Sequence, residues 1–422
     1  MNNKAILALT VGAAAVLAGS AVVTNSMFKS ELDQQLTDLP AGFEVQVIDP
    51  VTSILGGRQS YNITMHPEFI EQHLGDVGLY EPINFYINHN YSSSPLTVKS
   101  ELVLDLTKGD FSKVLEEFPE QAFTHLLTLN TNVFLDSQDA QFVIEPLKLE
   151  KDGVTINLGK TTSTISSDIA FTEGKFSFNL DTMNFAKAQD NFAFTSITSQ
   201  GNFITLGETQ VSEDMTFSIN GLTLNSELEG VKASIDTFTI ASSYLFPNKQ
   251  HIGLNTKLTI NNAEISNNEQ AFHITDTLFD LDITDINKAA YVDLLQASQN
   301  FAVLSDIEQP ILGVLTEGIN GSVNALNTTI NKVTLSSDGE FKLPGYNGNT
   351  LDHQLQQHVM TSFNSTLNLG LTANYATEFN HFAPFVEQML QQGFIKADDQ
   401  GNVSTKIKVE SGQVLANGQR IR

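Results

Sequence analysis

A two-part strand pattern recurs along the middle of the chain and constrains the fold more than any other feature. It is clearest in Phe217-Ser218-Ile219-Asn220-Gly221-Leu222-Thr223-Leu224, where apolar and polar residues alternate, a polar pair intervenes, and the alternation resumes in the opposite phase. Strict alternation is typical of a β-strand with one buried face, because successive side chains point to opposite sides. Further copies, some of them partial or weak, contain the pairs Glu145-Pro146, Asp181-Thr182, Thr195-Ser196, Asp236-Thr237, Asn261-Asn262, Thr284-Asp285 and Asn331-Lys332.

Each polar pair shifts the alternation by one residue, which would turn the later apolar side chains onto the wrong face unless the backbone compensates. A β-bulge compensates by re-aiming the strand, and a two-residue hairpin compensates by reversing it, for which Asn220-Gly221 is a favoured sequence. Glu145-Pro146 suits an edge or a bulge better than a tight hairpin. We therefore favour kinked long strands. The expected fold is mainly β, an N-terminal transmembrane helix followed by an extended, twisted antiparallel sheet of long kinked strands with covering helices.

Composition excludes several classes of function. The chain of 422 residues has no cysteine, so it forms no disulfide and has no thiolate metal site and no thiol nucleophile. Its 48 acidic residues exceed its 22 basic residues, and the net charge of −26 should repel nucleic acid and anionic lipid surfaces. We expect neither a cofactor nor a nucleic-acid partner.

The first part of the chain carries an apolar segment. Residues 5–23 lack charge, with Ala5, Leu9, Val16 and Val23 along them, and the segment is long enough to cross a bilayer as a helix. Lys4 precedes it, which places the short N-terminus in the cytoplasm by the positive-inside rule. A cleaved signal peptide is the competing interpretation, because small residues at 18–21 suit a peptidase. We predict an uncleaved single-pass anchor.

The remaining pattern divides the chain into four parts. Residues 1–29 are the anchor or signal peptide, 30–135 a membrane-proximal β-rich region with a helix, 136–286 the repeated-strand region, and 287–422 a C-terminal region of helices and strands. Amphipathic spacing predicts helices at 30–39, 111–129, 287–304, 310–319 and 382–392.

No motif in the sequence identifies a catalytic or metal site. His353 and His358 are five residues apart, a spacing that does not aim two imidazoles at one metal. Asp280, Asp282 and Asp285 lack the glycine and the distant glutamate of a calcium loop. We predict no catalytic, cofactor-binding or metal-binding residues. The alternative is a periplasmic hydrolase in which carboxylates such as Asp280, Asp282 or Glu340 act as acid and base, which requires two of them to converge in a cleft.

Two groups of residues stand out outside the repeated strands. After the anchor comes Ile87-Asn88-His89-Asn90, and near the end come Gly393-Phe394-Ile395 and the segment from Gly412 to Gly418. In these residues, and over nearly its whole length, the chain resembles the YdgA family of bacterial inner-membrane proteins. Ile87-Asn88-His89 is similar to a short apolar-x-His motif of that family, although Asn90 stands where the family has glycine, and the later residues resemble the family's terminal pattern. The resemblance implies a single-pass protein of the bacterial inner membrane with most of its chain in the periplasm, and it implies no established active site.

These observations predict a non-enzymatic envelope protein. The abundance of Phe and Leu on one strand phase suggests an apolar face that binds lipid or another envelope protein, unless helices such as 287–304 cover all of it. Without such a face the protein would be a scaffold. Homodimerisation through the anchor or through an exposed strand edge is a further expectation.

Overall fold

The computed structural model describes residues 42–53, 55–68, 81–94, 97–105, 107–110, 125–132, 136–151, 153–207, 209–226, 230–267, 270–299, 304–351 and 353–421. It contains two compact units, the first ending at Met183 and the second beginning at Asn184. Antiparallel strand pairs build both units, which confirms the expected mainly β fold with large antiparallel sheets. The predicted anchor at residues 5–23 and the predicted helix at 30–39 lie outside the described residues.

The first unit is a series of antiparallel strands paired in the order β1, β2, β3, β4, β5, β6, β9, β10, with β7 paired to β8. The strands are β1 Phe43–Ser53, β2 Gly56–Met65, β3 Ile83–Ser93, β4 Val98–Leu104, β5 His125–Asn132, β6 Ser137–Ile144, β7 Leu147–Lys151, β8 Val154–Leu158, β9 Thr161–Ser167 and β10 Glu173–Leu180. β11 Met183–Lys187 begins at the last residue of this unit.

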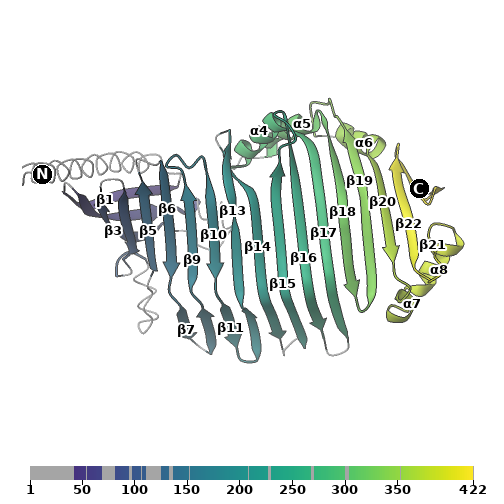
Figure 1. The fold of residues 1–422 in the computed structure, drawn as a ribbon, viewed down its shortest axis with the longest axis horizontal. Helices are drawn as coiled ribbons and strands as arrows, with labels where there is room; N and C mark the ends of the chain where they lie inside the picture. Colours follow the sequence, from purple (N-terminus) through teal and green to yellow (C-terminus); the bar gives the residue numbers. More distant parts are fainter. Residues whose placement is uncertain are drawn as a thin grey trace, which may run out of the picture. The chain divides into compact units, whose positions relative to one another are not determined.

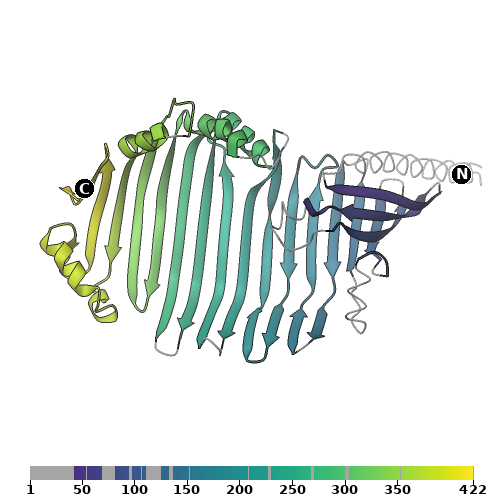
Figure 2. The ribbon, with the colours of Figure 1, turned by 180° about the vertical axis from the view of Figure 1, so that it is seen from behind.

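The second unit is a meander in which β13 to β20 pair in chain order and β22 follows β20. Its strands are β12 Asp190–Phe194, β13 Ser196–Leu206, β14 Thr209–Ser226, β15 Val231–Leu245, β16 His251–Ser266, β17 Ala271–Asn287, β18 Gly318–Ile330, β19 Val333–Pro344, β20 Asn364–Leu371, β21 Lys396–Ala397, β22 Val403–Glu410, β23 Gln413–Ala416 and β24 Gln419–Arg420. The described helices are α4 Lys288–Gln299, α5 Leu304–Leu315, α6 His353–Ser362, α7 Tyr375–Glu378 and α8 Ala383–Gln391. Figures 1 and 2 show α4, α5 and α6 at one end of the long strands.

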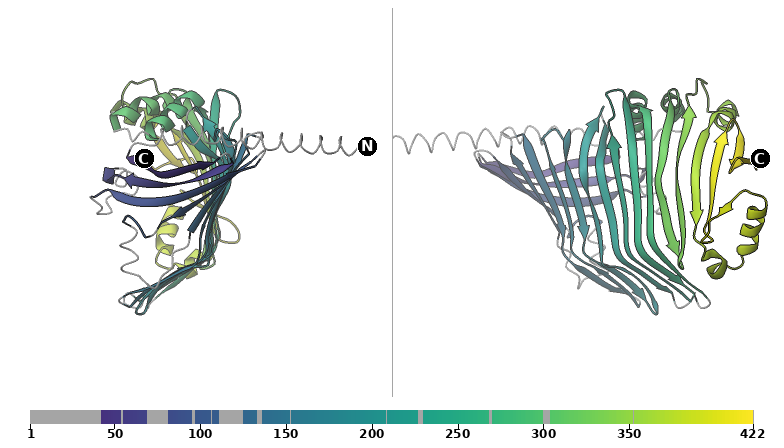
Figure 3. Two further views of the ribbon diagram at one scale, coloured as in Figure 1. Left: turned by 90° about the vertical axis from the view of Figure 1, so that its left-hand side faces the viewer. Right: turned by 45° about the vertical axis from the view of Figure 1, so that its right-hand side comes forward.

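Strands β14 to β17 continue through their polar pairs, as the kinked-strand interpretation predicted, whereas Thr195-Ser196 lies at the break between β12 and β13. β14 runs through Asn220-Gly221, and its pairing with β15 resumes in the same register as Leu222 opposite Ile235, so no β-bulge shifts the pairing there. Gly221 has φ +59°, a left-handed conformation that glycine adopts readily. On the next strands, Asp236-Thr237 lies opposite Asn261-Asn262. The polar pairs thus align across neighbouring strands in a transverse crease, and Figure 3 shows the strands bending near their lower ends.

One copy of the pattern forms a hairpin instead, so the kinked-strand prediction is wrong there. β18 ends at Ile330, β19 starts at Val333, and these two residues pair with each other. Asn331 and Lys332 between them have φ values of +47° and +72°. Two consecutive positive φ angles are typical of a type I′ turn, whose twist matches that of the flanking strands.

Among the predicted helices, 287–304 and 382–392 are confirmed as α4 and α8 over the described residues. The prediction at 310–319 is displaced, because α5 starts at Leu304, contains Pro310, and gives way to β18 at Gly318. Helix α6 was not predicted.

The prediction of a helix over 111–129 is wrong at its end. Residues 125–129 belong to strand β5, which pairs with β4 on one side and β6 on the other. Hydrogen bonding to two partner strands outweighs a helical spacing of apolar residues, because backbone pairing satisfies every donor and acceptor of the segment. The rest of the predicted helix, 111–124, lies outside the described residues.

Candidate functional site

One face of the sheet between β14 and β18 carries apolar side chains in cross-strand rows. Leu258 on β16 pairs with Ile240 on β15 and with Phe279 on β17, and Phe279 pairs in turn with Leu326 on β18. We call this set of residues the apolar face. Its members are Phe217, Ile219, Phe238, Ile240, Leu258, Ile260, Phe279, Leu281, Val323 and Leu326. All ten side chains are half-buried, which leaves a continuous apolar surface partly in contact with solvent.

Helices α4 and α5 cover one end of this side of the sheet. There the buried side chains of Leu206, Ile252, Ile286 and Val314 form a core, against which Tyr291, Val292 and Leu294 of α4 pack. Ile252 is fully buried in it. Among the residues that the structure describes, this core includes none of the ten members of the apolar face. Within the described residues, the core beneath the helices thus does not extend to the ten members of the apolar face.

Beyond the crease, a further apolar row lies at the far ends of the strands. Leu224 pairs with Ala233, Ala233 with Ile265, and Ile265 with Phe272. The exposed fractions of Leu224, Ile265 and Phe272 are 42%, 46% and 36%. We call these four residues the apolar lip. Large apolar side chains gathered in an exposed row are typical of an interaction surface rather than of a solvated sheet.

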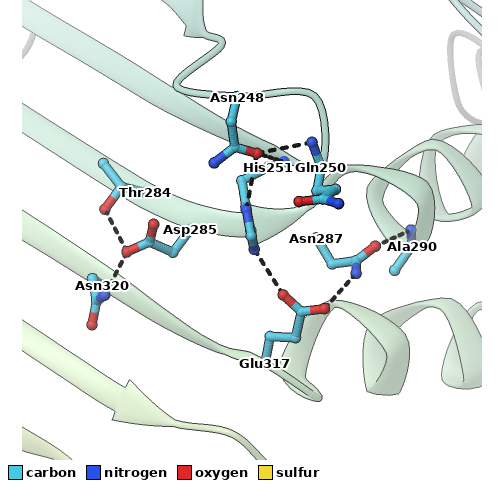
Figure 4. A network of polar contacts seen from close by, with 9 residues as sticks. All are labelled: Asn248, Gln250, His251, Thr284, Asp285, Asn287, Ala290, Glu317 and Asn320. Atoms are coloured by element: carbon cyan, nitrogen blue, oxygen red, sulfur yellow. Dashed lines mark hydrogen bonds and ion pairs between the residues drawn. The ribbon is translucent and has the colours of Figure 1, made fainter.

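A polar network lies at the opposite end of the long strands, which the helices cover (Figure 4). His251 begins β16, and its Nε2 lies 2.8 Å from Oε2 of Glu317, which stands between α5 and β18. The other carboxylate oxygen accepts a hydrogen bond of 2.8 Å from the amide of Asn287. Asn287 in turn caps α4, because its Oδ1 accepts the backbone N–H of Ala290 at 3.0 Å. We call His251, Glu317, Asn287 and the turn residue Asn248 the clasp.

Hydrogen bonding sets the electrostatics of the clasp. The amide of Asn287, and then His251, stabilise the charged form of Glu317 and hold the pKa of its carboxyl below the ordinary value. Nothing in the sequence pattern pointed to this pair, since Glu317 is 66 residues from His251 and follows a helix end. Only the strand pairing that places β17 between β16 and β18 brings them together.

The carboxylates considered for a hydrolase lie on the other face of the sheet. Asp280 and Asp282 alternate with Phe279 and Leu281 along β17, so they point away from the apolar face. Amide groups bind both carboxylates from the neighbouring strands. These bonds run from Asn255 Nδ2 to Asp280 at 3.2 Å and Asp282 at 2.7 Å, and from Asn324 Nδ2 to Asp280 at 3.2 Å and Asp282 at 2.8 Å.

Glu340 of β19 shares a transverse row with Asp282, because Ser322 of β18 pairs with each of them. Two strand spacings separate the two carboxylates' backbones, roughly 10 Å by ordinary sheet geometry. Glu340 is exposed. The arrangement is a polar ladder on a sheet surface, and amide binding accounts for Asp280 and Asp282 as a structural feature.

Of the predicted motif residues in the first unit, Ile87 and His89 lie on β3 with their side chains on the same side of the strand. His89 is only 2% exposed, between the rings of Tyr61 and Tyr91 with ring centroids 5.7 and 5.3 Å away. The Tyr61 hydroxyl is 2.9 Å from its Nδ1. Gln59 Nε2 donates to the same hydroxyl oxygen, so Tyr61 joins the two side chains.

Burial lowers the pKa of His89 to about 4, so the ring is neutral at physiological pH. The sequence placed His89 in a motif without predicting that it is buried. Its backbone position opposite Gln59 on β2 and Leu102 on β4 puts it in a central strand, where an aromatic neighbour on each side excludes water. His89 is therefore a structural residue that is buried in its neutral form, and its protonation at low pH should destabilise the fold.

The predicted motif glycines of the second unit lie in turns. Gly393 follows α8 with φ +74°, and its N–H bonds the carbonyl of Leu390 at 3.0 Å, as a helix C-cap does. Gly412 and Gly418 have φ values of +74° and +85° in the turns after β22 and β23. All three act through backbone conformation.

Within the described ranges, the structure contains no group of three or more His, Asp or Glu side chains that could hold a metal ion. The same part of the chain has no helix with the length and apolar character that a membrane crossing requires. No protein-family model, no curated protein and no solved structure matches the chain. The resemblance to the YdgA family therefore stays a sequence-based prediction.

Proposed function

We propose that this protein is a non-enzymatic, membrane-anchored protein of the bacterial periplasm whose apolar face binds the acyl chains of a lipid. The observation that carries the proposal is the apolar face itself, ten half-buried apolar side chains that stand in cross-strand rows on five adjacent strands. Acyl chains match such a surface because burial of apolar area provides affinity without directed polar contacts. The uncharged segment 5–23 supports the anchor, and the resemblance to the YdgA family supports the compartment.

Burial of the apolar face is a sufficient source of affinity. Each methylene removed from water contributes about 0.8 kcal/mol, so an acyl chain of roughly fifteen methylenes contributes about 12 kcal/mol. An association cost of about 4 kcal/mol leaves about 8 kcal/mol, which corresponds to micromolar affinity. The ten residues of the apolar face come from five adjacent strands. Adjacent strands are about 4.8 Å apart, so the width of the face across its five strands is roughly the length of such an acyl chain.

The first experiment is native mass spectrometry of the full chain purified in a mild detergent, followed by solvent extraction of co-purified material. We expect a lipid in stoichiometric amount. A protein that carries no lipid and takes up none from vesicles would contradict the binding function and leave the scaffold interpretation.

A charge on the apolar face tests the site itself. Leu258→Asp places a carboxylate in the middle of the face, and we expect at least a tenfold loss of lipid uptake because the charge would have to be desolvated. The matched control is Thr259→Asp, which adds the same charge one residue along β16 on the opposite face. Uptake is measured by fluorescence of a labelled phosphatidylcholine, and equal losses in both variants would remove the assignment to this face.

A further inference from the structure

Helices α4 and α5 are packed to each other and to the sheet at close range. The Cα atoms of the two helices approach where Gly313 meets Ala290, since a Cβ on Gly313 would lie 3.0 Å from that of Ala290. On the sheet side, Tyr291 of α4 shares a hydrogen bond of 2.9 Å with the hydroxyl of Tyr244. The pair of helices, which we call the helical cap, therefore behaves as one piece lying on the end of the apolar surface.

The proton positions on His251 follow from its partners. Asn248 Oδ1 accepts the backbone N–H groups of Gln250 at 2.8 Å and His251 at 2.9 Å, so this atom of the side chain is its oxygen. The same oxygen lies 3.1 Å from His251 Nδ1. Two acceptors do not bond to each other, and Nδ1 must therefore carry hydrogen.

The second ring nitrogen faces an acceptor as well. Oε2 of Glu317 is 2.8 Å from Nε2, and the other oxygen accepts from Asn287, whose own Oδ1 is occupied by Ala290 N–H. The orientation of the Asn287 amide is thereby determined, and Glu317 presents a carboxylate to the ring. His251 meets both acceptors only as an imidazolium with a hydrogen on each nitrogen.

We propose that the clasp holds the helical cap on the sheet while His251 is protonated and loosens it when the proton leaves. A neutral imidazole keeps one of the two bonds at most and no longer attracts Glu317, which connects α5 to β18 and, through Asn287, the start of α4. The inference rests on the proposed function, because it makes the cap a pH-dependent cover of the apolar end of the sheet that adjoins the apolar face. At higher pH the cap would open, and apolar side chains of that end, such as Ile252 and Ile286, would become accessible beside the apolar face.

The other charged groups near the clasp do not take over its role. Lys249 precedes His251 in the same turn, and Lys288 at the start of α4 places its Nζ 5.4 Å from the centre of the Phe246 ring. Asp285 bonds to Asn320 and Thr284. Within the described contacts, Glu317 is the acid that bonds the His251 ring.

Hydrogen exchange of the full chain tests the clasp without any ligand. At about pH 8.5 we expect the amides of α4 to exchange at least about threefold faster than at about pH 5.5, after correction for the intrinsic pH dependence with an unstructured peptide. His251→Gln should exchange at the fast rate at both pH values. Glu317→Gln should also weaken the response.

The control for this experiment is His273→Gln. His273 forms a cross-strand pair with Glu264 at 3.8 Å on the same sheet. Its variant should keep the wild-type response of α4. A wild-type response in His251→Gln, or equal responses in both histidine variants, would overturn the proposal.

A disulfide between the helical cap and the sheet tests whether movement of the cap causes the pH response. A Cβ on Gly207 would lie 4.0 Å from Cβ of Val292, within the range of disulfides, and the chain has no other cysteine. The oxidised Gly207→Cys/Val292→Cys variant should lose the pH response of α4, and its reduced form, with the same substitutions, should keep it. The reduced form also accounts for any strain at Gly207, whose φ is +66°.

Uptake of labelled phosphatidylcholine, whose headgroup charge is constant over this pH range, completes the test. We expect about threefold more uptake at about pH 8.5 than at about pH 5.5, and no pH difference in the oxidised variant. A cap that responds to pH in a protein that binds no lipid would uphold the clasp and reject the lipid function. Lipid uptake with an α4 that does not respond to pH would reject the clasp and leave the function standing.

Discussion

At the scale of single residues, two histidines lie in opposite environments. His89 is buried between two tyrosine rings, and burial lowers its pKa. His251 is partly exposed, and each of its ring nitrogens lies within hydrogen-bond distance of a side-chain oxygen. Neither environment is readable from the residues next to each histidine in the sequence.

The buried His89 predicts a loss of stability in acid. Its pKa is about 4 in the fold against 6.5 as the ordinary value, so between these pH values the unfolded chain binds a proton that the folded chain does not. The free energy of unfolding of the first unit should therefore fall as pH drops from about 6.5 to about 4, by up to about 3 kcal/mol.

Urea unfolding followed by circular dichroism at several pH values measures this loss. His89→Phe keeps the ring and cannot take up the proton, so it should flatten the pH dependence although it leaves Tyr61 without this partner. His273→Phe, at an exposed histidine, should keep the wild-type pH dependence. An acid dependence that survives in His89→Phe would assign it to other groups.

At the scale of strands, the crease and the hairpin show that similar polar pairs have different outcomes. Asn220-Gly221 is the more hairpin-like dipeptide, yet β14 continues through it because β13 and β15 pair with it on both sides. Asn331-Lys332 reverses the chain. The physical difference is the number of ladder hydrogen bonds that each outcome completes, and this depends on partners distant in sequence.

Gly221 should be required for the crease. Its φ is +59°, and a Cβ at this position would lie 2.6 Å from Oγ1 of Thr195. Gly221→Ala should therefore lower the free energy of unfolding of the second unit by about 2 to 3 kcal/mol, the sum of backbone strain and overlap. Thermal unfolding measures the change.

A double variant separates these two causes. Thr195→Ala removes the atoms that the new Cβ would meet, apart from its own Cβ, so adding it to Gly221→Ala should restore the overlap part and leave about 1 to 2 kcal/mol of backbone strain. No recovery in the double variant would show that overlap with Thr195 is unimportant.

At the scale of the whole molecule, charge and the apolar segment act together. A net charge of −26 opposes adsorption to anionic lipid surfaces, so a lasting association with membranes needs a hydrophobic anchor. The segment 5–23 is long enough to provide one. The charge would then keep the rest of the chain away from the bilayer surface, which suits a protein that presents an apolar face to single lipid molecules.

Membrane fractionation tests the anchor. The full chain should stay in the membrane pellet after an alkaline carbonate wash, and a variant that begins at Asn25 behind a cleavable signal peptide should be released to the soluble fraction. The control is the full chain with Leu9→Asp and Val16→Asp, which keeps the length of the chain but makes the segment 5–23 charged. Release of the unaltered full chain would favour the cleaved signal peptide.

The sequence by itself determined the secondary structure of the central region and its antiparallel pairing, because alternation and its phase reversal are local properties of the chain. It also indicated α4 and α8 through their apolar spacing. Only the tertiary structure decided which polar pairs bend and which reverse the chain, how far the helices cover the apolar face, and that His251 meets Glu317. These outcomes depend on strand register between distant segments, where many ladder bonds and side-chain contacts are formed together and no local pattern records their sum.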